Sequence, residues 1–153
     1  MITIFDNYIP EEIINTNKIF DVFVGKLPSS DDYDKWLKTP EVIIGVEEYK
    51  KFMRELLRNR SVKFECNCRG KDEADWHRGV VHRKSETIDH QMIGGVVDEV
   101  EFYTFGQVGI SFKHDHSFYQ VDKNNIYLID GEGFPEKFKK RMEAQLHKRR
   151  FDL

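Results

Sequence analysis

Cysteine is scarce in this chain of 153 residues, and long apolar segments are missing from it. The two cysteines, Cys66 and Cys68, are separated by one residue, too close together for the disulfide framework of a small secreted domain. No run of about eighteen apolar residues occurs, so the sequence predicts no membrane-spanning helix. We therefore expect a cytoplasmic protein in a reducing setting.

Several motifs of well-known enzyme classes are also missing. The sequence has no GxxxxGK[ST], GxGxxG, HExxH or GxSxG motif and no EF-hand loop. P-loop nucleotide hydrolases and dinucleotide-dependent oxidoreductases are therefore disfavoured. What the chain does have is a charged fraction of 33%, aromatic residues at 13% and a formal net charge of only -3. Its length and its content of Phe, Ile and Val predict one compact domain spanning residues 1–153.

The region from residue 61 to residue 130 carries the strand signals. Apolar and polar residues alternate in 61–69, 96–105 and 107–116, which is the period of a strand. Two shorter segments, 118–121 and 126–129, are separated by Asp-Lys-Asn-Asn, a composition typical of a hairpin turn. We expect an α+β fold in which residues 61–130 form an antiparallel sheet, curled or barrel-like because of its glycines.

Helices are predicted on both sides of this region. Residues 1–60 read as mainly helical, with helices over 11–24, from Ser30 or Asp31 to Leu37 with Pro40 as its end, and over 47–59. The last of these carries an apolar stripe that indicates a buried face: Tyr49, Phe52, Met53, Leu56 and Leu57. Residues 134–150 predict a C-terminal helix. We expect these helices to pack on the sheet.

The segment His114-Asp115-His116 is the most suggestive for chemistry. If 107–116 is one regular strand, His114 and His116 share its apolar face, about 7 Å apart. Two imidazoles so placed could act as acid and base in a metal-independent phosphodiesterase or ribonuclease, with His77 as a partner from another strand. The simpler interpretation is two hydrogen-bonded histidines at the end of a sheet.

The same spacing recurs in Cys66-Asn67-Cys68, whose two thiols would also point to the apolar side of a strand. If the two strands were neighbours, Cys66, Cys68, His114 and His116 could form a tetrahedral zinc site. The pairs are far apart in the sequence, and CxC is less diagnostic than paired CxxC motifs. Zinc is therefore an alternative, and no cofactor is the main expectation. The simpler interpretation is that both cysteines are small buried apolar residues.

The C-terminal helix is basic and suggests a third kind of site. Its Lys137, Lys139, Lys140 and Arg141 could follow the phosphates of a nucleic acid. The whole chain is slightly acidic, however, and no nucleic-acid-binding motif occurs in it. A solvated basic helix near the acidic N-terminal segment is the simpler interpretation.

Taken together, these patterns favour a small cytoplasmic binding or regulatory protein that acts on a protein or small-ligand partner without turnover. The first alternative is the histidine-dependent phosphodiesterase or ribonuclease, and the second is the zinc-binding domain. Nucleic acid is a further candidate partner, and a membrane is not expected as one.

Overall fold

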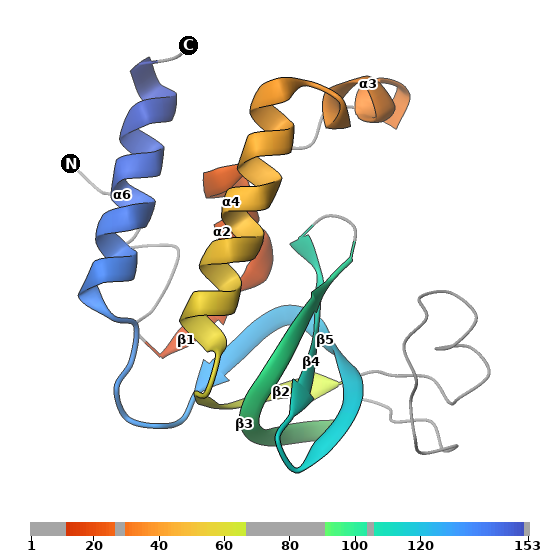
Figure 1. Ribbon diagram of the computed structural model, residues 1–153, viewed down its shortest axis with the longest axis vertical. Helices are drawn as coiled ribbons and strands as arrows, with labels where there is room; N and C mark the ends of the chain where they lie inside the picture. The colour runs from red at the N-terminus through yellow and green to blue at the C-terminus, as the bar shows by residue number, and fades with distance from the viewer. Residues whose placement is uncertain (1–11, 27–29, 67–90, 104–105, 152–153) are drawn as a thin grey trace.

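The computed structural model describes residues 12–26, 30–66, 91–103 and 106–151. In chain order the elements are β1 (Ile13–Asn15), α2 (Thr16–Phe23), the 3-10 turn η1 (Ser30–Asp32), α3 (Tyr33–Leu37), α4 (Pro40–Leu57), β2 (Ser61–Cys66), β3 (Gln91–Phe102), β4 (Val108–Phe112), β5 (Asp115–Leu128) and α6 (Glu136–Phe151). Helices α2, α4 and α6 stand together at one end of the strands, and α3 lies at the far tip of this helical layer (Figure 1).

The strands form one antiparallel sheet that closes on itself, which confirms the α+β fold. The order is β1-β5-β2-β3-β4, and β5 also pairs with β4, so that β5, β2, β3 and β4 make a ring of hydrogen bonds. The ring closes because β3 is long enough to pair with two strands, β2 and β4, and β5 is long enough to pair with three, β1, β2 and β4. In β3, the half before Val97 pairs with β2 and the half after it pairs with β4.

Strand β5 is continuous where the sequence predicted a hairpin. Phe64 of β2 pairs with Ile126 of β5, and Cys66 of β2 pairs with Val121 of β5. The four residues 122–125 of β5 therefore form a bulge opposite a single residue of β2. Lys123 and Asn124 have φ values of 55° and 61°, as turn residues often do. The prediction of two separate strands is wrong because the N-terminal segment holds this bulge: the Asn15 side-chain amide donates to Asn125 Oδ1 at 2.9 Å.

The first described residues were predicted to be mostly helical, and the structure instead starts with strand β1. Ile14 is fully buried and pairs with Ile126 of β5, which draws this segment into the sheet. Asn15 then caps α2, because its Oδ1 accepts a hydrogen bond from the backbone N–H of Lys18 at 3.0 Å. The side-chain cap therefore fixes where the helix begins.

Helix α4 begins seven residues before the predicted start. Pro40 is its first residue. The first residues of a helix have no hydrogen-bond partner for their backbone N–H, so a proline is well tolerated there. Pro40 therefore begins α4, whereas the sequence predicted it as the end of the preceding helix. The predicted stripe is confirmed, since Tyr49, Phe52, Met53, Leu56 and Leu57 are all buried. Burial raises the pKa of Tyr49, and its phenol donates to the Gly106 carbonyl at 2.7 Å.

Helix α6 packs against α4 through aromatic side chains. Phe138 and Met142 are buried, as is Phe134 just before the helix. The rings of Phe52 and Phe138 meet edge to face with centroids 5.2 Å apart. These contacts join the helices to the strands, because the buried side chains of both layers belong to one cluster. None of the helices in the described part of the chain is long and apolar enough to cross a membrane.

An ion pair ties the start of β2 to the end of β5. Arg60, only 9% exposed, donates from Nε to Asp130 Oδ2 at 2.8 Å and from Nη2 to Asp130 Oδ1 at 2.7 Å. Two parallel hydrogen bonds of this kind are the strong form of a charged pair. They lower the pKa of Asp130 from 3.8 to about 2.

The pH dependence of unfolding should therefore depend on Asp130. A carboxylate whose pKa is lower in the folded chain stabilises the fold fully above its unfolded pKa, and this stabilisation is lost as the pH falls toward the folded pKa. Between about pH 5 and about pH 2, we expect the wild type to lose about 1 to 2 kcal/mol more than Asp130→Asn, after allowing for solvent screening. Urea denaturation at each pH measures this, and equal losses in both proteins would contradict it.

Candidate functional site

The two histidines predicted to share one strand lie on either side of a tight turn. Strand β4 ends at Phe112, Lys113 and His114 form the turn, and β5 begins at Asp115, which pairs with Phe112. The regular strand predicted over 107–116 is therefore wrong. The physical reason is the Asp115 carboxylate, which accepts hydrogen bonds from the Ser117 backbone N–H and the Tyr119 hydroxyl and so stabilises the chain reversal.

His114 ends a column of stacked rings. Its imidazole lies nearly parallel to the Phe112 ring, with an angle of 9° and centroids 5.5 Å apart, and Phe112 stacks on Phe64 at 5.8 Å. Gly95 of β3 leaves the space for this column, because a Cβ there would lie 2.6 Å from His114 Cε1. The imidazole is exposed while one face rests on the core, so packing fixes the position of the ring.

His116 lies near the bulge in β3. Its Nδ1 is 3.5 Å from Asp98 Oδ2, and its side chain is 63% exposed. A carboxylate beside one imidazole nitrogen favours the tautomer with the proton on that nitrogen. The pair is accessible to water, so we expect only a weak contribution to stability from it.

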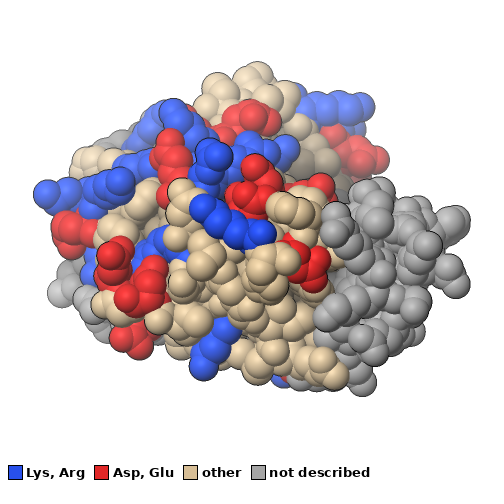
Figure 2. Space-filling view, turned by 60° about the horizontal axis from the view of Figure 1, so that its bottom comes forward, with Lys and Arg blue, Asp and Glu red and all other residues tan. Residues whose placement is uncertain are grey.

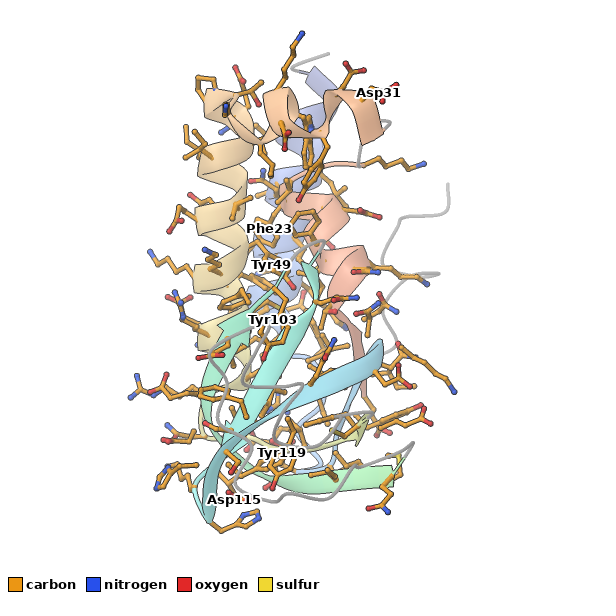
Figure 3. All side chains as sticks on the ribbon, turned by 90° about the vertical axis from the view of Figure 1, so that its right-hand side faces the viewer. Phe23, Asp31, Tyr49, Tyr103, Asp115 and Tyr119 are labelled. Atoms are coloured by element: carbon orange, nitrogen blue, oxygen red, sulfur yellow. The ribbon has the colours of Figure 1, made fainter. Side chains whose placement is uncertain are left out.

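These positions weaken the case for acid–base catalysis without testing it. His114 and His116 contact different partners, the Phe112 ring and the Asp98 carboxylate. The third predicted member, His77, lies outside the described residues. Asp115 and Tyr119 lie together at the end of the molecule opposite Asp31 (Figure 3). Catalysis by the two histidines stays a prediction.

The four residues of the predicted zinc site are only partly described. Cys66 is fully buried in β2, where it pairs with Gln91 and Val121, and Cys68 lies outside the described residues. Within the described part of the chain, no group of three or more His, Cys, Asp or Glu side chains could hold a metal ion. Cys66 is thus not gathered with both His114 and His116, and zinc binding stays a prediction.

The predicted nucleic-acid-binding residues lie on α6, where some are engaged in contacts within the protein. The Arg141 guanidinium donates to the Glu55 carboxylate and lies 5.1 Å from the Phe52 ring centroid. Lys137 Nζ lies 5.1 Å from the Phe138 ring centroid. Lys140 is exposed and Lys139 is half-buried. On the face shown in Figure 2, Lys and Arg side chains are interspersed with Asp and Glu. Nucleic-acid binding stays a prediction.

A further surface, which sequence reasoning missed, is formed by residues 31–48 and is called here the helical tip. Helix α3 buries none of its residues, and three apolar side chains of the tip are exposed: Leu37 at 36%, Ile43 at 51% and Ile44 at 59%. Trp36 and Val46 lie beside them, half-buried against the core. The helix predicted over 47–59 leaves both isoleucines in the connecting segment before it. In a helix that begins at Pro40, Ile43 and Ile44 lie outside the apolar stripe, which predicts that they are exposed.

The helical tip is also acidic. It holds six carboxylates and two lysines, a net charge of -4. The next ten residues, 49–58, hold four basic side chains and one acidic one, a net charge of +3. The outer surface of this layer therefore changes sign along α4.

Comparison with family models, curated proteins and solved structures found no match for this chain.

Proposed function

We propose that this protein is a small cytoplasmic binding protein whose helical tip docks on a protein partner, and that it acts without turnover. The observation behind the proposal is the exposure of Leu37, Ile43 and Ile44 together at one end of the molecule. The cytoplasmic setting rests on the cysteine content of the sequence, as argued above.

Much of the apolar surface of Ile43 and Ile44 is exposed to water and adds nothing to the stability of the fold. Burying a side chain such as Ile or Leu is worth about 1.5 to 3 kcal/mol. Ile43 and Ile44 are 51% and 59% exposed, so about half of this is unused in the free protein. Isoleucine is also a weaker helix former than Lys or Glu at an exposed position. Clustered apolar side chains rimmed by charged ones are typical of protein-binding surfaces.

Two contrasts support the helical tip over the other candidate surfaces. His114 and His116 have structural partners in Phe112 and Asp98. The Arg141 charge is balanced by Glu55. The apolar side chains of the tip, by comparison, are exposed in the fold and would become buried in contact with a partner. Binding is therefore the function that the geometry supports best.

The proposal predicts that a photocrosslinker in the tip captures a protein partner. We expect the full chain with p-benzoylphenylalanine in place of Ile43 to form a discrete crosslinked species in cells. The matched control carries the same group in place of Ile129, which is 50% exposed against 51% for Ile43. Mass spectrometry would identify the captured chain. Equal labelling from both positions, or none from position 43, would contradict the proposal.

A further inference from the structure

We infer that the partner of the helical tip presents a basic amphipathic helix. This inference rests on the proposed function and adds to it the chemistry of the partner. Two features of the tip carry it. The exposed apolar side chains lie among carboxylates, and the tip offers helices as its binding surface.

Carboxylates lie next to the exposed isoleucines on α4. Glu47 is four residues from Ile43 and three from Ile44, so it neighbours both on the helix surface. Glu48 and Glu41 are four and three residues from Ile44, and all three carboxylates are exposed. Cβ atoms at these spacings lie about 5 to 6 Å apart. A partner that buries the isoleucines must therefore place its own side chains beside these charges.

Helix α3 adds carboxylates on one side of the same surface. It lies beside the first turns of α4, on the side away from α6 (Figure 1, Figure 3). Asp31, Asp32 and Asp34 belong to η1 and α3, and all of them are exposed. Leu37 of α3, which is 36% exposed, continues the apolar surface. The apolar side chains of both helices thus have an acidic rim.

The fold accounts for only part of this acidic charge. Glu41 suits the first turn of α4, where the backbone N–H groups favour a carboxylate, but Glu47 and Glu48 lie beyond that turn. Glu47 lies 3.9 Å from Lys50 at the surface, where such an ion pair contributes little. Glu48 and Asp31 form no ion pair with any other described residue. These charges can therefore pair with a basic partner.

A basic partner fits this surface better than a second copy of the chain does. Two tips in contact would bring carboxylates against carboxylates, and like charges facing each other across an interface are strongly unfavourable. A basic helix is attracted to the tip, whose net charge is -4, and repelled from residues 49–58, whose net charge is +3. We therefore expect it to lie across α4 toward α3 and not along α4.

The partner segment should be a helix because of what the tip offers. Residues 31–48 form helices and the turn between them, with no strand edge among them. A partner cannot extend a sheet there and must pack through side chains, as an amphipathic helix does on an apolar surface. Few apolar side chains are involved, so we expect a dissociation constant of about 1 to 100 µM.

Three synthetic peptides of about 16 residues, long enough to form a helix, test this inference with the full chain. The first has a leucine face and lysine elsewhere, the second has glutamate in place of the lysine, and the third has the composition of the first with its leucines scattered. Fluorescence anisotropy should show the first bound as stated above and the other two at least about tenfold more weakly. Salt should weaken binding of the first peptide, because charged contacts are screened.

Charge variants of the chain locate the binding of this amphipathic lysine peptide. Asp31→Lys with Asp34→Lys should weaken it at least about tenfold, since attraction becomes repulsion. The matched control is Glu99→Lys with Glu132→Lys, which makes the same change of net charge at exposed positions outside the tip. The control should weaken binding much less.

Serine variants test the apolar contact. Ile44→Ser should weaken binding of the amphipathic lysine peptide about three- to tenfold, as expected for the half of an isoleucine side chain that a partner can still bury. Ile129→Ser, at a comparably exposed site outside the tip, should leave binding unchanged. Thermal melts of all variants confirm that the fold is retained.

The outcomes separate this inference from the proposed function. The basic helix is overturned if the amphipathic lysine peptide fails to bind, if the three peptides bind equally, or if the Asp31 and Asp34 variant binds as well as its control. A discrete protein captured from position 43 through an acidic segment would also overturn it, while still supporting the tip as a docking surface. Self-association of the wild-type chain in sedimentation equilibrium that Ile44→Ser abolishes would identify a second copy as the partner instead.

Discussion

Replacing Phe52 by alanine should lower the free energy of unfolding by about 4 kcal/mol, the largest loss that we expect from any single change discussed here. Phe52 is fully buried in α4 and contacts an aromatic ring on each neighbouring helix. Its centroid lies 4.9 Å from that of Phe23 in α2 and 5.2 Å from that of Phe138 in α6. The alanine variant would leave a cavity where three helices meet, since rigid neighbours collapse only partly.

The matched control for Phe52→Ala is Ile43→Ala in the same helix. Ile43 is 51% exposed, so its removal in the monomer should change the free energy of unfolding by less than about 0.5 kcal/mol. Urea denaturation of the two variants measures both losses. If Phe52→Ala cost as little as Ile43→Ala, the packing of α2, α4 and α6 described here would be wrong.

Replacing Gly45 by valine should destabilise the protein by about 3 kcal/mol, although valine is ordinarily tolerated better than glycine within a helix. The reason is the close approach of α4 to the end of α2. A Cβ at position 45 would lie 2.5 Å from the backbone carbonyl oxygen of Phe23. Backbone cannot rotate away as a flexible side chain can, so the two helices would have to move apart.

The alanine variant at the same position separates packing from helix propensity. Helix propensity alone predicts that Gly45→Ala stabilises α4 by about 1 kcal/mol. The contact with Phe23 predicts the opposite sign, a net loss of about 1 to 2 kcal/mol, with Gly45→Val costing more. Thermal or urea denaturation of the two variants decides between these predictions. A gain in stability on Gly45→Ala would show that α2 and α4 do not cross so closely.

Much of the fold could be predicted because local signals and burial agree. The apolar side chains of β2 alternate with polar ones, and Val62, Phe64 and Cys66 are all fully buried. The same agreement holds for the stripe of α4, in which Tyr49 and Phe52 lie among the least exposed residues. In both elements the apolar residues recur with the period of the structure and lie on its one buried face, and under this condition a sequence pattern predicts the structure reliably.

The turn at Lys113 and His114 could not be predicted from composition. Neither residue is typical of a tight turn, and the alternation of Ile110 and Phe112 continues through His114 in the sequence. The reversal depends on the side-chain contact between Asp115 and Tyr119, which no period reveals. The error was consequential, because the shared face of the two histidines depended on an unbroken strand.

Two other predictions were wrong because the same residue types occur in more than one kind of local structure. Pro40 was interpreted as the end of a short helix, whereas proline is equally at home in the first turn of the next one. Turn-forming residues 122–125 predicted a hairpin but form a bulge, because Asn15 and Thr16 bind Asn125 and Asn124 from across the sheet. Long-range contacts decide such cases, and a single sequence does not reveal them.

The measurement that tests the central proposal most directly compares three forms of the full chain, each with the photocrosslinker in place of Ile43. The first is otherwise wild type, the second carries His114→Ala and His116→Ala, and the third carries Asp31→Lys and Asp34→Lys. If the helical tip is the functional surface, the crosslinked species persists in the histidine variant and is lost in the charge variant. Loss in the histidine variant with retention in the charge variant would contradict the account and place the function at the turn between β4 and β5.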